Sequence, residues 1–578
     1  MKDLYQKKIG QRTTLLILFF MLWFGVIIFR LVQLQVIQHP RLKARVIDQN
    51  QDKVDILPRR GTIFDRYGNI FARSIPCQSV FLSPFKDETN ELHFQKINRL
   101  KKILGLSAED IRKIKTRIKK KNNFIYIKRK ISPEAAEKVK NLNLSGIFFE
   151  EESKRFYPQK NLAAHVIGRV NIDNKGQSGI EITYDSILGG KKGKRLNLID
   201  AKKRQYKYEI LKNPQPGKDL YLTIDETIQY YASRELKKAV LKARAKWGTV
   251  IVSNPESGEI LAMANYPDFN LNHPPSQLSL TDRIKAIHPR FDPGSTFKII
   301  LASAALESKK VSLNDKFDCS KGYRRISGKT IRDHHRYDIL TFPEVIIHSS
   351  NVGATLISDK LGKKTFYNMI KAYGFGSKTG IDLWAEEKGT FHSLDKWEAI
   401  SPASLSIGYE ISVTAIQMLQ AVNVLANRGV IIPFRIAKNI PKKFESNPGE
   451  HKRVLSTQTA LILTDILTKV VTEGTGKEAN IIGYTVAGKT GTAQKLDQKT
   501  GRYSSNSHIS LFTGFVPADK PVISMIVVID DPQGKYYGGE IAAPVFRDIG
   551  AYTLQYLQIP QETSPSQPLI TARLERQD

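Results

Sequence analysis

The chain has 578 residues, more than the ~100 to 200 residues of a typical domain, so it contains more than one folded unit. Hydrophobic residues make up 41% and charged residues 25% of it, with 38 Gly and 26 Pro, which excludes a collagen-like or disordered polymer. Lys and Arg outnumber Asp and Glu by 89 to 56, and the net charge of +33 indicates an anionic partner, whether nucleic acid, lipid headgroup or acidic polymer. The only cysteines, Cys77 and Cys319, lie far apart in sequence, which excludes a disulfide framework or a zinc site of paired cysteines.

An apolar segment near the N-terminus predicts a single transmembrane helix at residues 13–33. Residues 15–29 are all apolar or Gly, and Arg30 can place its guanidinium among the headgroups at the helix end. A cleaved signal peptide and a buried core helix are the alternatives, but the sequence that follows lacks the small residues of a cleavage site. Four cations precede the segment, so residues 1–12 are expected in the cytoplasm and the rest outside: Lys2, Lys7, Lys8 and Arg12.

A strongly basic window follows at residues 112–130, with ten Lys or Arg and no acid. Phe124 and Tyr126 lie within it, and in a cytosolic protein such a mixture would indicate nucleic-acid binding. Outside the membrane, DNA and RNA are not expected as partners. The remaining interpretations are a solvated face or attraction to anionic lipid or wall polymer.

The rest of the chain has the pattern of a multidomain α/β protein of the α+β kind. Residues 40–217 alternate short apolar runs, basic stretches and Gly or Pro, which predicts an elongated mixed domain. Pro214, Pro216 and Gly217 mark its end, and strands and helices mix over residues 218–552. Residues 553–578 are expected to be a loosely held tail, rich in Pro, Ser, Gln and charge from residue 557 onward.

Within residues 218–552, local patterns predict an antiparallel sheet flanked by helices. A helix is expected after Thr223, because Thr223 and Glu226 have the spacing of a capping box. Residues 247–255 and 259–267 are two strand-like runs around a turn, and 508–517 and 521–530 form a second hairpin pattern.

The first motif with catalytic potential is the segment FDPGSTFKIILASAALES, in which a nearly all-apolar helix begins near Ser295. Lys298, three residues later, is expected on the same helix face as Ser295, so its amine can approach the hydroxyl. A desolvated lysine favours its neutral form and can act as a general base, and the helix N-terminus suits a developing oxyanion. Taken alone, the pattern also fits an N-cap serine followed by a surface-reaching lysine.

The second motif is HSSNVG, which lies between two predicted helices, the first of them opened by the capping-box pair Thr341 and Glu344. Ser349 offers a hydroxyl for proton transfer, and Asn351 offers an amide that can hold a peptide group. N-capping of the second helix is the alternative role for this loop.

The third motif is AGKTGTAQ, a strand-like run expected at a sheet edge. Lys489, Thr490 and Thr492 supply a cation and two hydroxyls that can bind a carboxylate, and Gly491 lets another backbone approach closely. A polar edge strand protected by lysine is the alternative.

The order S-x-x-K, S-x-N and K-T-G is the signature of penicillin-binding proteins and serine β-lactamases, and the chain resembles a class B penicillin-binding protein over nearly its whole length. Two departures from the family pattern are Glu410, where glycine is usual, and Tyr67, where asparagine is usual. Further segments that look like family motifs are 59–74, 155–170 and 176–190 in the first domain and 474–477 and 538–546 in the second.

The resemblance implies a transmembrane anchor, a pedestal domain of the dimerisation type at 40–217 and a transpeptidase domain at 218–552. It implies that Ser295 attacks the penultimate D-Ala carbonyl of a stem peptide while Lys298 accepts its proton. Ser349 and Lys489 would return a proton to the leaving amine, and backbone N–H groups of Ser295 and Thr492 would form the oxyanion hole. Substrate would be held by Asn351, Thr490, Gly491 and Thr492.

The implied function is a peptidoglycan D,D-transpeptidase of the septal, cell-division type in the bacterial cytoplasmic membrane, trapped by penicillin and other β-lactams. No metal or organic cofactor is implied. Expected partners are stem peptides ending in D-Ala-D-Ala, a membrane-embedded glycan polymerase and other division proteins.

Arg60, Gly61 and the pair 65–66 are candidates for the partner interface or for a structural role. The alternatives are a hydrolase, either a D,D-carboxypeptidase or a β-lactamase, and a membrane β-lactam sensor, for which the twelve residues before the helix leave no output domain.

Overall fold

The structure is a computed structural model in which residues 2–41, 51–84, 88–120, 122, 124–199, 205–275, 283–438, 440, 451–496 and 501–562 are described. The chain divides into two compact units. Unit 1 comprises Met1–Arg59, Pro76–Ser153 and Gly190–Gly217; unit 2 comprises Arg60–Ile75, Lys154–Gly189 and Lys218–Asp578. The limits 40–217 and 218–552 expected for the two domains stay predictions.

The N-terminal apolar segment forms a helix, as predicted. Helix α1 runs over Lys2–Val32 and continues as one π-helical stretch, η1, over Gln33–Ile37. The part from Ile9 to Ile37 is long and apolar enough to cross a membrane, and its large apolar side chains are exposed. Exposure of a continuous apolar helix in water is unfavourable, which fits a helix whose solvent is lipid.

Unit 1 has a small helical core beside a three-stranded antiparallel sheet of order β1-β6-β7. Helices α3, α4 and α5 begin at side-chain caps from Thr89, Ser107 and Ser132, as expected for Ser and Thr at helix N-termini. The elements are β1 (Gln51–Ile56), α3 (Asn90–Leu104), α4 (Ala108–Lys119), β4 (Ile125–Ile131), α5 (Pro133–Asn141), β6 (Gly193–Ile199) and β7 (Gln205–Lys212), with β3 (Ile70–Leu82) and β5 (Ile147–Phe156) shared between the units.

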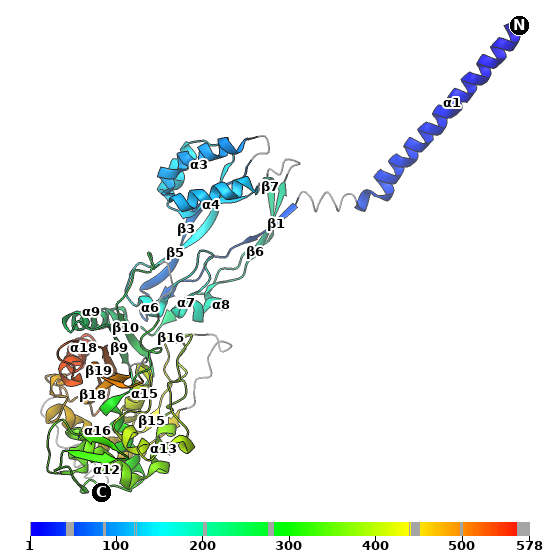
Figure 1. The fold of residues 1–578 in the computed structure, drawn as a ribbon. Helices are drawn as coiled ribbons and strands as arrows, with labels where there is room; N and C mark the ends of the chain where they lie inside the picture. Colours follow the sequence, from blue (N-terminus) through cyan, green and yellow to red (C-terminus); the bar gives the residue numbers. More distant parts are fainter. Residues whose placement is uncertain are drawn as a thin grey trace. The chain divides into compact units, whose positions relative to one another are not determined.

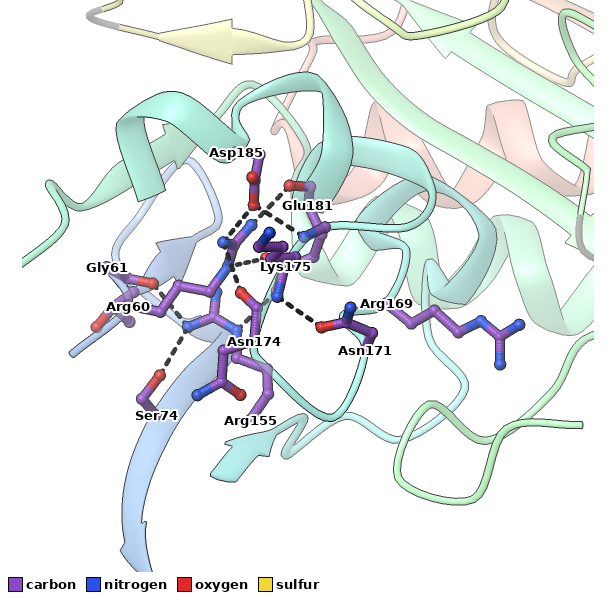
Figure 2. Close-up of polar contacts among 12 residues, drawn as sticks. Arg60, Gly61, Ser74, Arg155, Arg169, Asn171, Asn174, Lys175, Glu181 and Asp185 are labelled. Atoms are coloured by element: carbon purple, nitrogen blue, oxygen red, sulfur yellow. Dashed lines mark hydrogen bonds and ion pairs between the residues drawn. The ribbon is translucent and has the colours of Figure 1, made fainter. Parts of the chain in front are cut away.

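The pedestal-type motifs of unit 2 meet in a buried ion-pair network (Figure 2). The Arg60 guanidinium donates to Glu181 and to Asp185, both at 2.6 Å, and Arg155 donates to the other Glu181 oxygen at 2.6 Å and to the Gly61 carbonyl at 2.7 Å. Arg60 is only 2% exposed, which favours the structural role over a direct partner contact. The segments around it are β2 (Ile63–Phe64), α6 (Ala164–Ile167), α7 (Gly179–Thr183), α8 (Asp185–Leu188) and β8 (Leu220–Leu222).

The large domain of unit 2 is built on a five-stranded antiparallel sheet of order β10-β9-β20-β19-β18, as predicted (Figure 1). The two expected hairpins are present, and the K-T-G strand lies at an edge of the sheet. Val250 and Val527 pack on one face, while Ile251 and Val528 pack on the other. The strands are β9 (Trp247–Ser253), β10 (Ile260–Tyr266), β18 (Ala487–Leu496), β19 (Tyr503–Val516) and β20 (Ile523–Asp530).

Helices cover both faces of this sheet. Helices α9 (Glu226–Lys242) and α18 (Ala543–Tyr556) pack their apolar side chains against one face of the sheet. Helices α10, α15 and α16 pack in the hydrophobic core on the opposite face of the sheet. The remaining helical segments are η3 (Gly294–Phe297), α10 (Lys298–Glu307), α11 (Phe342–Ile347), α12 (Asn351–Leu361), α13 (Lys363–Ala372), η4 (Leu394–Lys396), α14 (Ser401–Ser406), α15 (Ala415–Ala426), α16 (Thr457–Thr472), η6 (Lys477–Ala479) and α17 (Gly538–Ile541). Short strands complete the unit: β11 (Lys316–Asp318), β12 (Tyr323–Ile326), β13 (Lys329–Arg332), β14 (Ile339–Thr341), β15 (Val430–Ile431), β16 (Ala437–Lys438) and β17 (Lys452–Arg453).

The predicted N-cap of helix α9 was wrong. Helix α9 forms, but its N-cap is Asp225, whose carboxylate accepts from the N–H groups of Thr227 and Ile228. The Thr223 hydroxyl instead donates to the Ile260 carbonyl at 2.7 Å, because Thr223 follows β8 directly and lies in the core.

The start of the C-terminal tail is also better held than predicted, since Tyr484 donates to the Ile559 carbonyl and the Glu562 carboxylate accepts two bonds from Thr485. The tail residues 563–578 lie outside the described residues.

Candidate active site

Ser295 and Lys298 lie together, as their spacing predicts. Ser295 is in the 3-10 turn η3, and Lys298 is the first residue of α10. The Lys298 Nζ is 3.2 Å from the Ser295 Oγ, and Lys298 is fully buried. The apolar helix α10 fixes this arrangement, because its side chains from Ile299 to Ala305 are buried and leave little freedom to rotate the turn.

The surroundings of Lys298 favour its neutral form. Its Nζ donates to the Ser349 carbonyl at 2.6 Å and to the Asn351 Oδ1 at 2.8 Å, and lies 3.2 Å from the Ser349 Oγ. Burial first, and then the positive charge of Lys489, holds the pKa of the Lys298 amine well below its usual range, while the Asp333 carboxylate opposes them. A neutral amine at hydrogen-bond distance from a hydroxyl has the geometry and the electrostatics of a general base.

The three residues of the S-x-N loop make different contacts. Ser349 and Asn351 contact the Lys298 amine, whereas Ser350 caps α12 by accepting from the Gly353 N–H at 2.9 Å. The predicted capping of the second helix is therefore confirmed for Ser350, while the catalytic roles of Ser349 and Asn351 stay predictions. Ser349 has φ +59°, a backbone conformation that is costly for a residue with a side chain and that turns its carbonyl toward the amine.

Asp333 holds this loop in place, and the sequence pattern did not reveal it. One carboxylate oxygen accepts from the Ser350 hydroxyl at 2.9 Å, and the other accepts from the backbone N–H groups of Asn351 and of Val352, the latter at 3.0 Å. The Asn351 side-chain amide also donates to the Arg332 carbonyl at 2.9 Å. The end of β13 thus fixes both the backbone and the side chain of Asn351.

Lys489 places a second amine near the first. It is fully buried, and within the described residues its Nζ has no hydrogen-bond partner. Burial lowers the pKa of Lys489 to about 7. A buried cationic donor without a partner is unstable on its own and is satisfied by an anionic ligand, so Lys489 is suited to a substrate carboxylate.

The hydroxyls of the K-T-G strand have different partners. The Thr490 Oγ1 is 2.6 Å from the Thr475 Oγ1, while the Thr492 Oγ1 accepts from the Gly538 N–H at 3.0 Å. An accepting hydroxyl keeps its own proton for donation, so Thr492 is better placed than Thr490 to bind a carboxylate. Within the protein, Gly491 permits a close approach of the Thr296 and Leu511 side chains, and the approach of a ligand backbone there stays a prediction.

Glycines allow three segments of the site to meet without side chains between them. A Cβ on Gly294 would lie 2.7 Å from the Thr492 carbonyl, and a Cβ on Gly408 would lie 2.1 Å from the Gly294 carbonyl. The Gly294 N–H donates to the Gly408 carbonyl at 3.2 Å. The turn that carries Ser295 is therefore held directly against β18 on one side and the 408 segment on the other.

A carboxyl–phenol pair close to Ser295 in sequence was also not predicted. The Tyr503 hydroxyl donates to Asp292 at 2.6 Å, and its ring packs edge-to-face on Tyr409 at 4.9 Å. Burial raises the pKa of Asp292 to about 6, against the opposing effect of the Tyr503 bond. These contacts join the start of β19 to the residue three positions before Ser295.

Two regions of the chain match known protein families. Residues 248–551 match the penicillin-binding protein transpeptidase domain, and residues 55–222 match the penicillin-binding protein dimerisation domain. The chain belongs to the penicillin-binding proteins. This member of the family is therefore a serine D,D-transpeptidase of peptidoglycan that binds β-lactams, as predicted.

Curated relatives align with this penicillin-binding protein over nearly its full length. Stage V sporulation protein D of Bacillus subtilis is 36% identical over 92% of this chain and 84% of the relative. The probable peptidoglycan D,D-transpeptidase PenA of Neisseria gonorrhoeae is 34% identical over 95% and 92%. The peptidoglycan D,D-transpeptidase FtsI of Escherichia coli is 33% identical over 92% and 89%.

Solved structures share the fold. A peptidoglycan synthetase from Bifidobacterium adolescentis superposes with a TM-score of 0.70 at 25% identity, covering 90% of this chain and 99% of the other. Penicillin-binding protein 3 of Mycobacterium tuberculosis, complexed with ampicillin, superposes with a TM-score of 0.69 at 26% identity, covering 89% and 99%. The predicted fold class, an N-terminal apolar helix followed by a pedestal and an α+β transpeptidase domain, is confirmed.

Proposed function

We propose that Ser295 is the nucleophile of this penicillin-binding protein and Lys298 its general base. The observation that carries the proposal is the 3.2 Å separation of the Lys298 Nζ and the Ser295 Oγ within a site that keeps the amine neutral. As the Ser295 oxygen attacks the carbonyl of the penultimate D-Ala, its proton moves to the Lys298 nitrogen. The backbone N–H groups of Ser295 and Thr492 then stabilise the oxyanion.

The proton next travels to the leaving amine. The Lys298 Nζ is 3.2 Å from the Ser349 hydroxyl, which is a short enough distance for relay through that oxygen. The amide bond breaks, terminal D-Ala leaves as a neutral amine, and the penultimate D-Ala remains as an ester of Ser295. The amine of a neighbouring stem peptide then attacks this ester, Ser295 recovers its proton, and an amide cross-link forms.

Asn351, Lys489 and Thr492 hold the donor peptide. Asn351 is fixed by Asp333 and Arg332, so its amide is preorganised to bind the stem-peptide backbone. Lys489 and the Thr492 hydroxyl bind the terminal carboxylate, with Thr490 and Gly491 shaping the strand between them. A penicillin carboxylate uses the same groups, and its strained amide acylates Ser295 in place of D-Ala-D-Ala.

The enzyme acts outside the cytoplasmic membrane, anchored by α1, and serves septal wall synthesis. The charge bias of residues 1–12 supports this orientation. The 536–546 segment and the lack of long inserts resemble the septal type, and relatives named FtsI match at 33% identity over 92% of the chain. A membrane-embedded glycan polymerase and other division proteins are its expected partners.

Labelling with a fluorescent penicillin tests the nucleophile. Wild type and Ser308→Ala should be labelled equally, whereas Ser295→Ala should not be labelled. Ser308 is a matched control because it lies at the C-terminal end of α10, away from Ser295. Labelling of Ser295→Ala would discard the assignment. A chase without drug separates the functions, since a D,D-transpeptidase keeps the label while a β-lactamase releases it rapidly.

Lys298→Ala tests the base in the same assay. The variant should still bind penicillin but form the acyl-enzyme at least about a hundredfold more slowly, as expected when general base catalysis is lost. Wild-type acylation rates in Lys298→Ala would assign the proton transfer to another group.

A further inference from the structure

The first part of the basic window, residues 112–119, lies in helix α4 of unit 1. Ile114 and Ile118 point into the core of the unit, so the other faces of the helix are left to polar residues. Arg112, Arg117 and Lys119 are exposed and Lys115 is half-buried. The arrangement is an amphipathic helix whose outward side is almost entirely cationic.

Helices α3 and α4 pack together within unit 1 (Figure 1). A groove lies beside α4 and is lined by residues of α4 and by Phe94 of α3. Its volume is about 450 Å³. The Lys115 ammonium lies over the Phe94 ring at 5.0 Å, so an aromatic side chain of α3 closes the groove from one side. The lining combines an apolar floor of Phe94, Ala108 and Ile111 with a polar wall of Arg112, Lys115, Thr116 and Lys119.

The cations of the groove are not neutralised by the carboxylates of their own helix. Glu109 pairs with Lys113 at 2.7 Å, and Asp110 pairs with Lys128 at 3.8 Å while it caps the helix. Within the part of the chain that the structure describes, Arg112, Lys115 and Lys119 form no ion pair. Three cations beside an apolar floor, without counter-charges, form a surface complementary to an acidic and partly apolar ligand.

We propose that this groove, lined by residues 94, 108, 111, 112, 115, 116 and 119, binds an acidic amphipathic helix of a partner protein. Arg112 and Lys119 are seven residues apart on α4, which corresponds to about 10.5 Å along the helix axis. A partner helix packed along α4 meets both with two acidic residues that are also seven positions apart. Apolar residues between those acids, three or four positions from each, then contact Phe94 and Ile111.

The apolar floor distinguishes this ligand from a simple polyanion. A phosphate-rich polymer or a lipid headgroup gains from cations but gains nothing from Phe94, Ala108 and Ile111. A peptide helix uses both parts of the groove. The inference concerns unit 1 alone and does not depend on the proposed chemistry of Ser295.

The probe is a synthetic 18-residue helical peptide on an Ala-Gln background, with two Glu seven positions apart and two Leu between them on the same face. The control peptide has the same composition with the Glu pair moved to the opposite face. Binding to the full chain in detergent micelles is followed by fluorescence anisotropy of the labelled peptide at low salt. Phosphatidylglycerol vesicles and inorganic polyphosphate are tested as the competing ligands.

The variant Arg112→Glu/Lys119→Glu should bind the probe at least about tenfold more weakly than wild type, because two attractive charge pairs become repulsive. The matched control, Lys138→Glu/Lys212→Glu, changes net charge equally at exposed sites of unit 1 outside the groove and should bind within about twofold of wild type. Both variants should retain wild-type labelling by penicillin, which verifies folding of the large domain.

Three results would overturn the proposal. The first is equal binding of the probe and the control peptide, which would reduce the groove to a nonspecific anion surface. The second is equal weakening by both charge variants. The third is vesicle or polyphosphate binding that depends on Arg112 and Lys119 while probe binding does not, which would assign the groove to lipid or to a polyphosphate-like polymer.

Discussion

The pH dependence of acylation tests the separate functions proposed for the two buried lysines, Lys298 as general base and Lys489 as the cation that binds a carboxylate. In the proposed mechanism Lys298 must be neutral to accept a proton, and its pKa is held well below its usual range, so activity is gained as pH rises through that lowered pKa. Lys489 must be charged to bind a carboxylate, and its pKa of about 7 means that this charge is lost as pH rises further. The second-order rate constant for acylation by penicillin should therefore pass through a maximum.

The magnitude of the alkaline fall follows from the pKa of Lys489. With a pKa of about 7, only about 10% of Lys489 is charged at pH 8 and about 1% at pH 9. The rate constant should therefore fall to about a tenth and about a hundredth of its value with Lys489 fully charged. The assay is the rate of acyl-enzyme formation, followed by mass spectrometry, as a function of pH. Because the second-order constant reports the free enzyme, the unliganded pKa is the relevant one.

The methyl ester of the same penicillin is the matched control. It has no carboxylate, so it should react more slowly at pH 6 and show no fall between pH 7 and pH 9. An identical alkaline limb for acid and ester would refute the reasoning, because Lys489 would then act on the reacting centre and not on the carboxylate.

Three further predictions follow from named contacts. Asp333→Asn should slow acylation about tenfold, because the charge-assisted bonds to the S-x-N loop are lost. It should also move the acidic limb of the pH–rate profile to lower pH, because Asp333 raises the pKa of Lys298. An unmoved acidic limb would leave Asp333 only a structural role. Glu181→Gln should cost about 3 to 5 kcal/mol, because buried Arg155 loses its carboxylate partner and buried Arg60 keeps only Asp185. The cost is measured by calorimetry, and an unchanged unfolding temperature would contradict this. Glu410→Gly should stabilise the fold by about 0.5 to 1 kcal/mol, because residue 410 has φ +61°; loss of stability on denaturant unfolding would mean that the Glu410 side chain contributes more than its backbone costs.

The contact within the first motif of the candidate site could be predicted from sequence because that motif is local. Ser295 and Lys298 are three residues apart in one helical segment, so their proximity depends on helix geometry alone. The K-T-G strand was placed at a sheet edge by its pattern of apolar and polar residues. Joining the three motifs into one site depended on the resemblance to a family.

The positioning residues could not be predicted, because their function depends on packing between distant segments. Asp333 follows a two-stranded hairpin with no strong hydrophobic pattern, and only its contact with the start of α12 gives it a role. The Tyr503–Asp292 bond joins residues that are 211 positions apart. The cap of α9 was misplaced for the opposite reason, since Thr223 has the correct spacing but tertiary contacts direct its hydroxyl to Ile260.

The glycine contacts beneath Ser295 restrict how resistance to β-lactams can arise. A methyl group on Gly294 or Gly408 would collide with backbone atoms and displace the turn that bears Ser295, the proposed nucleophile. Cells selected by a drug therefore gain nothing from substitutions at these two positions, because cross-linking would be lost together with drug susceptibility. Escape mutations in this protein are expected at neighbouring positions where a changed side chain leaves this turn in place.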